Sequence, residues 1–185
     1  LDWNNGNRNI LTDPRLSGLL VGQTLHTEAH EIYRALIEAT AFGALTIIKR
    51  IEEYGIQVDE IINCGGLAVK NPLLMQIYAD VTGRPMKVSR SEQTCALGAA
   101  IFGAVAAGKE AGGFTDVSEA REAVCGVRDE IFTPAAENRE VYGNMYTLYR
   151  ELHDAFGTEE WSGNPARVMK ELITIREKQR GKKDA

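Results

Sequence analysis

Aromatic residues and long apolar runs are scarce in this chain, and neither sign of charge dominates it. Phe, Trp and Tyr make up 7% of the 185 residues. The longest run without charge or strong polarity covers residues 95–108, about 14 residues against the roughly 20 that a membrane-spanning helix needs. The 21 basic and 26 acidic residues give a net charge of -5, which provides no broad positive field for a phosphate backbone. The composition therefore disfavours both a membrane protein and a nucleic-acid partner.

Cysteine is scarce as well. Cys64, Cys95 and Cys125 lie about 30 residues apart without a CxxC pair, which indicates neither a zinc site nor a disulfide framework. This usage fits a reducing cytoplasm, and Cys64 and Cys95 are expected to be buried as small apolar side chains. An initiating Met is absent, and a chain that opens on Leu1 without a signal peptide, a capped helix or a strand is expected to be a portion of a longer protein.

Apolar residues, by contrast, make up 44% of the chain, enough for a globular core. Residues 1–26 are rich in Gly, Asn and Pro, and we expect loops there with one or two short extended segments. Hydrophobic periodicity and Gly/Pro punctuation then predict helices and strands in alternation: helix 28–54 with Thr27 as its N-cap, strand 59–64, helix 71–82, strand 85–89 and helix 94–107. This order predicts an α/β layer.

Beyond Gly108 the pattern predicts helices alone, over residues 117–126, 134–156 and 164–179. The chain ends in REKQRGKKDA, with five basic and two acidic residues. We interpret this segment as the solvated end of a helix, whose cations suit the helix dipole, rather than as a phosphate-binding tail.

Two side-chain patterns on these helices are typical of ordinary structural roles. The row of Tyr142, Tyr146 and Tyr149 favours a core stripe with hydroxyls at its rim over a platform for stacking bases. Arg34 and Glu38 are four residues apart, which favours a surface ion pair on one helix face.

The most informative stretch is Cys64-Gly65-Gly66, at the carboxyl end of a predicted strand. Two glycines there let a flat ligand lie against the backbone, and ligands of open α/β sheets bind at that end. A five-residue link follows, and Asn71 at its end either caps the next helix or hydrogen-bonds a ligand. By itself the pair of glycines is weak evidence for a ligand and favours a tight strand-to-helix turn. The chain lacks GxGxxG and GxxxxGK[ST], so it has neither of those phosphate-binding signatures.

The sequence around this turn resembles a known family over a long ordered series of segments. NCGGLAVKNPLLMQIYADVTGRPMKV and SEQTCALGAAIFGAVAAGK resemble the adenosine motif and connecting helix of the FGGY carbohydrate kinases, within the actin-like ATPase superfamily. DWNNGNRNILTDPRLSGLLVGQTLHT, EIYRALIEATAFGALTIIKRIEEYG and EIFTPAAENREVYGNMYTLYRELHDAFG are similar to pentulose kinases within it. The resemblance implies an α/β fold: residues 1–108 as part of the second, ribonuclease H-like lobe, and residues 109–185 as a helical extension.

The resemblance also implies a site. In this family ATP lies in a cleft between two lobes, with adenosine against the Gly-Gly turn, here Gly65 and Gly66. Leu67 is expected beside it and Asn71 near the base. One more residue separates the glycines from the Asn than in glycerol kinases, so the contact of Asn71 is the less certain of these. The connecting helix matches at Ala96 to Ala100, where small residues allow the lobes to approach closely.

The same resemblance places the chemistry elsewhere. Phosphoryl transfer needs phosphate loops, Mg²⁺ carboxylates and a base, and the family carries these upstream of Leu1, so no catalytic residue and no metal ligand is assigned here. The implied cofactor is ATP with Mg²⁺, and the implied substrate is a pentulose bound mainly by the other lobe, with L-ribulose of arabinose catabolism expected. Xylulose, D-ribulose and a non-enzymatic helical interaction module remain alternatives, and the oligomeric state stays open.

Two further groups of residues are weaker candidates for a functional site. Asp2 and Arg8, in an Asn- and Gly-rich loop, are either near the cleft or part of a plain turn with a surface Arg. His26 and His30 are four apart, but the order H-x-E-x-H and the position of His26 ahead of the expected helix disfavour a zinc site.

Overall fold

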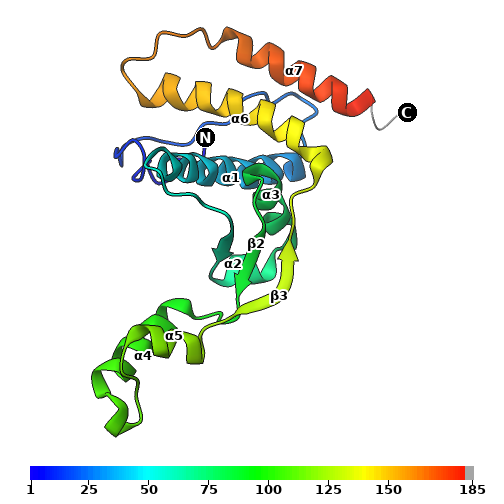
Figure 1. Ribbon diagram of the computed structural model, residues 1–185. Coiled ribbons are helices and arrows are strands. Elements are labelled where there is room, and N and C mark those ends of the chain that lie inside the picture. Colours follow the sequence, from blue (N-terminus) through cyan, green and yellow to red (C-terminus); the bar gives the residue numbers. More distant parts are fainter. Residues whose placement is uncertain (182–185) are drawn as a thin grey trace. The chain divides into compact units, whose positions relative to one another are not determined.

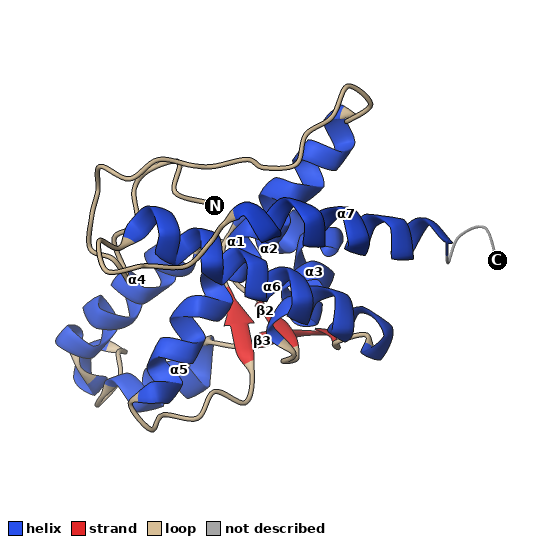
Figure 2. Cartoon of the chain, turned by 90° about the horizontal axis from the view of Figure 1, so that it is seen from above, coloured by secondary structure: helices blue, strands red, loops and turns tan. Residues whose placement is uncertain are grey.

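A computed structural model describes residues 1–181, which group into two compact units. The helical unit contains Leu1–Val58, Asp80–Gly83 and the chain from Pro134 on, and the sheet unit contains Asp59–Ala79 and Arg84–Thr133. Both are drawn in Figures 1 and 2. The last four residues of REKQRGKKDA, 182–185, lie outside the described residues. No helix in the described part of the chain is long and apolar enough to cross a bilayer.

The sheet unit is built on three strands in the order β1-β2-β3. β1 (Ile61–Asn63) and β2 (Met86–Ser89) are parallel, with Ile61 opposite Met86, and β3 (Val127–Phe132) is antiparallel to β2. Between β1 and β2 the chain forms α2 (Gly66–Lys70) and α3 (Pro72–Thr82). Apolar side chains of these helices and of β2 form the core: Ala68, Met75, Ala79, Met86 and Val88.

After β2 the chain forms α4 (Thr94–Ala107), a short 3-10 turn at Lys109–Ala111 and α5 (Val117–Val124), which packs against α4. Apolar residues occur on every side of α4. Among its described residues only Ile101 is buried. The chain then returns to the sheet as β3, at its edge (Figure 1).

Three long helices make up most of the helical unit: α1 (Ala29–Glu53), α6 (Ala136–Gly157) and α7 (Ala166–Gly181). α6 packs against both α1 and α7. Phe42 of α1 lies against the three tyrosines of α6, with its ring centroid 6.2 Å from Tyr142, 6.1 Å from Tyr146 and 5.5 Å from Tyr149. All four side chains are buried. The predicted tyrosine stripe is therefore the core of this unit.

The hydroxyls of this stripe are hydrogen-bonded within the helical unit. The Tyr142 hydroxyl donates to Oε1 of Glu38 at 3.0 Å, and the Arg34 Nε–H donates to the same oxygen at 2.8 Å. Burial first, and the Glu38 carboxylate second, raise the pKa of Tyr142 to about 12. Arg34 and Glu38 do form the expected pair, but Glu38 is buried rather than at the surface. The i,i+4 spacing alone could not show that α6 covers it.

Three local predictions are wrong. Residues after Gly108 do not form helices alone, because β3 pairs with β2. The link after Gly66 is not irregular, because it forms α2. Thr27 does not cap α1. The N-cap is Glu28, whose backbone N–H donates to Oε2 of Glu31 at 2.9 Å in a capping box.

The predicted burial of two cysteines is wrong, whereas the predicted loop at residues 1–26 is confirmed. Cys64 and Cys95 are exposed rather than buried, because Cys64 follows a three-residue strand at the sheet edge and Cys95 lies on an uncovered side of α4. The loop interpretation of residues 1–26 is confirmed, with isolated bridges joining Asn4 to Gly6 and Asn7 to Asp13 in place of extended strands.

The start of α6 is held by a buried carboxylate. Asp80 accepts a hydrogen bond from the Ala135 backbone N–H at 2.8 Å through Oδ1 and another from Asn138 Nδ2 at 2.8 Å through Oδ2. Ala135 is the N-cap of α6 and has no capping side chain. Asp80 therefore satisfies a donor at the positive end of this helix.

Replacing this carboxylate is expected to be costly. Asp80→Ala should lower the free energy of unfolding by about 2–4 kcal/mol, because two hydrogen bonds to a buried charged acceptor are lost. Urea denaturation of both variants measures the difference, and Asp129→Ala on exposed β3 serves as the control. A loss no larger than that of the control would contradict the capping role.

His153 is buried, with a relative exposure of 1%, in the helical unit. Its Nδ1 lies 2.9 Å from Oδ1 of Asp154, and its ring packs edge-on against Trp3 with centroids 5.2 Å apart. Burial lowers the pKa of His153, against the opposing pull of Asp154. The folded protein therefore favours the neutral imidazole.

The lowered pKa of His153 makes the folded state less stable at acidic pH. Above the ordinary histidine pKa of about 6.5 both the folded and the unfolded state hold a neutral ring, so stability is unaffected. Below it the unfolded state binds the proton more readily, and stability should fall at up to about 1.4 kcal/mol per pH unit. Urea denaturation at pH 7.5 and pH 5.5 measures this fall, and His153→Gln should reduce it whereas His26→Gln, at an exposed residue, should not. If the loss of stability between pH 7.5 and pH 5.5 is the same in His153→Gln as in the unmodified chain, His153 does not cause it.

Candidate functional site

The Gly-Gly turn begins directly after β1. Gly65 is the N-cap of α2 and has φ +92°, a conformation that side chains with a Cβ rarely adopt. Gly66 opens α2. A Cβ built on either glycine meets no atom within 4 Å, so the surface of the turn is open.

The short helix α2 holds this surface in place. Ala68 is buried in the core of the sheet unit with Met75 and Met86. Leu67, on the other side of α2, is 74% exposed. The turn therefore combines an anchored backbone with an open, apolar face, which suits a flat ligand such as a purine.

Asn71 performs one of the two roles that its position allows. Its Oδ1 accepts a hydrogen bond from the Leu74 backbone N–H at 3.0 Å, and its backbone carbonyl accepts from Met75. Asn71 therefore caps α3. A contact between its amide and a ligand stays a prediction.

The turn lies at the carboxyl end of two parallel strands, because β1 and β2 run in the same direction and Asn63 is opposite Val88. In open α/β sheets this edge is where ligands bind. Ser89 ends β2 and Arg90 follows it, so both lie at this edge. The position of Arg90 directly after a predicted strand is the signal that could have identified it. The Arg90 backbone N–H donates to the Gly126 carbonyl at 2.9 Å, which joins this edge to the start of β3.

The chemistry of this edge favours binding rather than catalysis. Gly65, Gly66, Leu67 and Asn71 include no acid, base or nucleophile. Across residues 1–181 no three His, Cys, Asp or Glu side chains converge as metal ligands.

The other candidates lie in the helical unit. Oδ1 of Asp2 accepts a hydrogen bond from the Tyr149 hydroxyl at 2.9 Å, so this carboxylate fixes the opening loop to α6. Arg8 is exposed. His30 Nδ1 lies 3.2 Å from a Glu28 carboxylate oxygen, and both side chains are exposed. An approach of Asp2 or Arg8 to a ligand stays a prediction.

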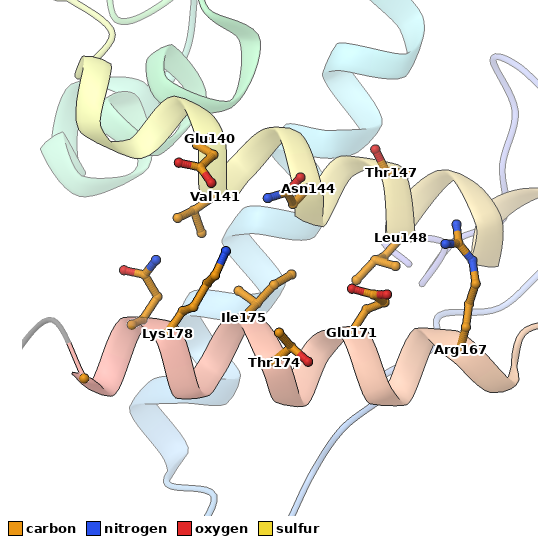
Figure 3. Close-up of a pocket in the computed structure, with 12 residues that line it drawn as sticks. Glu140, Val141, Asn144, Thr147, Leu148, Arg167, Glu171, Thr174, Ile175 and Lys178 are labelled. Carbon is orange, nitrogen blue, oxygen red and sulfur yellow. The ribbon is translucent and has the colours of Figure 1, made fainter.

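A cavity of about 620 Å³ lies in the helical unit between α6 and α7 (Figure 3). Val141 and Leu148 of α6 and Ile175 of α7 supply apolar lining (Figure 3). The acidic Glu140 and Glu171 and the basic Arg167 and Lys178 line it as well. Its arginine, Arg167, is paired with Glu151. None of the four predicted site residues lines it. We assign it no ligand, because its volume reflects the spacing of two helices and its charges cancel.

Comparison with known proteins decides the family. A model of the C-terminal domain of the FGGY family of carbohydrate kinases matches residues 1–107. The chain belongs to the FGGY family of carbohydrate kinases. The expected α/β class is confirmed by solved FGGY kinases of the same fold. A ligand-bound xylulose kinase from Lactobacillus acidophilus matches 85% of this chain and 31% of its own, with TM-score 0.70 and 22% identity. A xylulose kinase from Rhodospirillum rubrum matches 78% of this chain and 28% of its own, with TM-score 0.63 and 26% identity.

Curated FGGY relatives are more similar in sequence. A ribulokinase of Anoxybacillus flavithermus is 52% identical over 95% of this chain and 32% of its own length. A ribulokinase of Halalkalibacterium halodurans is 54% identical over 85% of this chain and 28% of its own. A ribulokinase of Mycolicibacterium smegmatis is 48% identical over 96% of this chain and 31% of its own. The chain thus spans about a third of the length of these relatives.

Proposed function

We propose that this chain is the ATP-binding C-terminal portion of a kinase that phosphorylates L-ribulose to L-ribulose 5-phosphate in the catabolism of arabinose. The observation that carries the proposal is the 52% identity with a ribulokinase across 95% of the chain. The aligned region extends beyond the family domain at residues 1–107 into α6 and α7. The cytoplasm is the proposed location, since a catabolic sugar kinase draws on its ATP.

The proposed role of the sheet unit is to hold adenosine. The open backbone at Gly65 and Gly66 supports this role, because a purine can approach within van der Waals distance where a Cβ would otherwise lie. Leu67 supplies exposed apolar surface beside the turn, and Asn71 fixes the start of α3. These residues bind and orient; they move no proton.

The remaining chemistry is assigned to other parts of the parent protein. Transfer of the γ-phosphoryl group to a sugar hydroxyl needs in-line positioning, a base and compensation of the developing charge. Mg²⁺ bound to ATP supplies charge compensation in such enzymes, and the residues described here do not fit a site for it. We therefore place the Mg²⁺ ligands, the base and most pentulose contacts outside this chain.

A second candidate is a kinase for another sugar, such as xylulose or D-ribulose. The solved xylulose kinases and a gluconate kinase from Lactobacillus acidophilus share the fold, but at 22–26% identity they support the fold alone. Membership of a kinase family also weighs against a helical interaction module without activity.

The sugar is tested on the complete parent protein. With ATP held constant, kcat/KM for L-ribulose should exceed the values for D-ribulose, xylulose and gluconate by at least about tenfold, because hydroxyl-reading sites reject a misplaced group strongly. A coupled ADP-release assay measures all four sugars. A higher value for xylulose or gluconate would replace L-ribulose as the proposed substrate.

A further inference from the structure

A second hollow in the helical unit lies where the loop before α1 meets the end of α7. Its volume is about 190 Å³. The loop residues 20–24, the first turns of α1 and two arginines of α7 line it. Pockets for ordinary organic ligands measure about 300–1,000 Å³, so an occupant of this hollow is small.

Arg176 and Arg180 are four residues apart, so both guanidinium groups come from one side of α7. Both are exposed. Neither has a hydrogen bond or ion pair with any residue in the described part of the chain. Arg34 and Arg167 of the same unit are, by contrast, paired with Glu38 and Glu151. The hollow therefore carries two positive charges that are not used to hold the fold.

The loop adds uncharged donors to these two cations. Gly22 has φ +89°, and a Cβ on it would lie 3.7 Å from the Leu172 side chain, so the loop backbone runs close to α7. The backbone N–H groups of Gly22 and Gln23 find no acceptor among residues 1–181. Side chains of Gln23 and His26 also line the hollow.

One acidic side chain reduces the positive charge of this hollow. Glu31 also lines the hollow, and its Oε2 accepts the hydrogen bond from the Glu28 backbone N–H at 2.9 Å. This carboxylate is thus engaged in the capping box of α1. Two guanidinium groups against one carboxylate leave a net positive charge at the hollow.

We propose that this hollow is a site for a phosphate group, held by Arg176, Arg180 and the loop at Gly22 and Gln23. Guanidinium groups bind phosphate oxygens through paired N–H donors, and backbone N–H groups complete such sites. The phosphate belongs either to inorganic phosphate or to a phosphorylated sugar, which present the same oxygens. Under this proposal Arg176 and Arg180 bind a phosphate group, in addition to lying at the solvated end of α7.

The experiment titrates the 185-residue chain with inorganic phosphate and, separately, with ribose 5-phosphate, using calorimetry and amide NMR. Both probes should bind, and the amide resonances of Gly22 and Gln23 should shift. The double variant Arg176→Gln/Arg180→Gln should weaken binding at least about tenfold. Tighter binding of the sugar phosphate would assign the site to phosphorylated sugars, and equal binding would assign it to inorganic phosphate.

Lys170→Gln/Lys178→Gln is the matched control, because it removes the same charge from the same helix and Lys178 lines the other cavity (Figure 3). This variant should retain binding. If both double variants weaken phosphate binding equally, the binding depends only on the net charge of α7 and the proposed site is wrong. Absence of saturable phosphate binding to the unmodified chain would also overturn the proposal. Circular dichroism of each variant verifies that it is folded.

Discussion

The 185-residue chain by itself is expected to show no detectable phosphorylation of L-ribulose by MgATP. The proposed adenosine contacts at Gly65 and Gly66 orient one end of the nucleotide, but nothing among the described residues offers a metal cluster for the triphosphate. In-line positioning of reactants contributes on the order of 10⁵-fold or more to such reactions, and closure between two lobes excludes water. Without these, kcat/KM should fall at least about 10⁵-fold below that of the parent protein.

A coupled assay measures this loss on a preparation free of the host's own kinase. The parent protein in the same assay is the positive control. A circular dichroism spectrum dominated by helix, as the seven α-helices of residues 1–181 require, establishes that the inactive chain is folded. Turnover comparable to the parent would mean that the catalytic groups lie within these 185 residues, and the assignment of chemistry to the rest of the parent would fail.

In the parent protein, Gly66→Val should raise KM for ATP about tenfold or more and leave KM for the sugar within about twofold. The open space at Gly66 is where the proposed purine approaches, so the added methyl groups would displace the ligand. Each tenfold loss corresponds to about 1.4 kcal/mol of binding free energy. Sugar binding should be little affected, because its proposed contacts are in another lobe.

Gly66 is a better test position than its neighbour. Gly65 has φ +92°, so a side chain there would strain the backbone whether or not a ligand binds. Gly66 has no such conformation, and Val has a helix propensity no worse than that of Gly, so the substitution by itself is not expected to destabilise α2. Gly143→Val, at an equally open helical glycine of α6, is the control. Equal increases in KM for both substrates would remove Gly66 from the nucleotide site.

The sequence predicts the long elements well because their patterns are strong. α1, α3 and α6 carry apolar residues at helical spacing over 11 to 25 residues, and each matches its predicted range within two residues. β1 and β2 are short, but glycine and proline bound them and their centres are apolar. This order of elements predicts that the Gly-Gly turn lies at the carboxyl end of β1, at the sheet edge. Its assignment to adenosine, with Leu67 and Asn71, is what the resemblance to the FGGY kinases implies.

The missed features have weak local signals. β3 reads VRDEIF, and its exposed edge position lets charged residues replace the alternation that identifies a strand. α2 has five residues, too few for a period to be visible. α4 is apolar on every side, so its sequence does not indicate which face is buried, and Cys95 is exposed for that reason. The burial of Glu38 depends on Tyr142, which is 104 residues away.

The most direct test of the account is a crystal structure of the parent protein with a non-hydrolysable ATP analogue and Mg²⁺. The account predicts the adenosine in van der Waals contact with the backbone of Gly65 and Gly66, with Leu67 beside it and the metal held by residues outside this chain. Adenosine bound away from this turn, or Mg²⁺ held by side chains of residues 1–185, would contradict it.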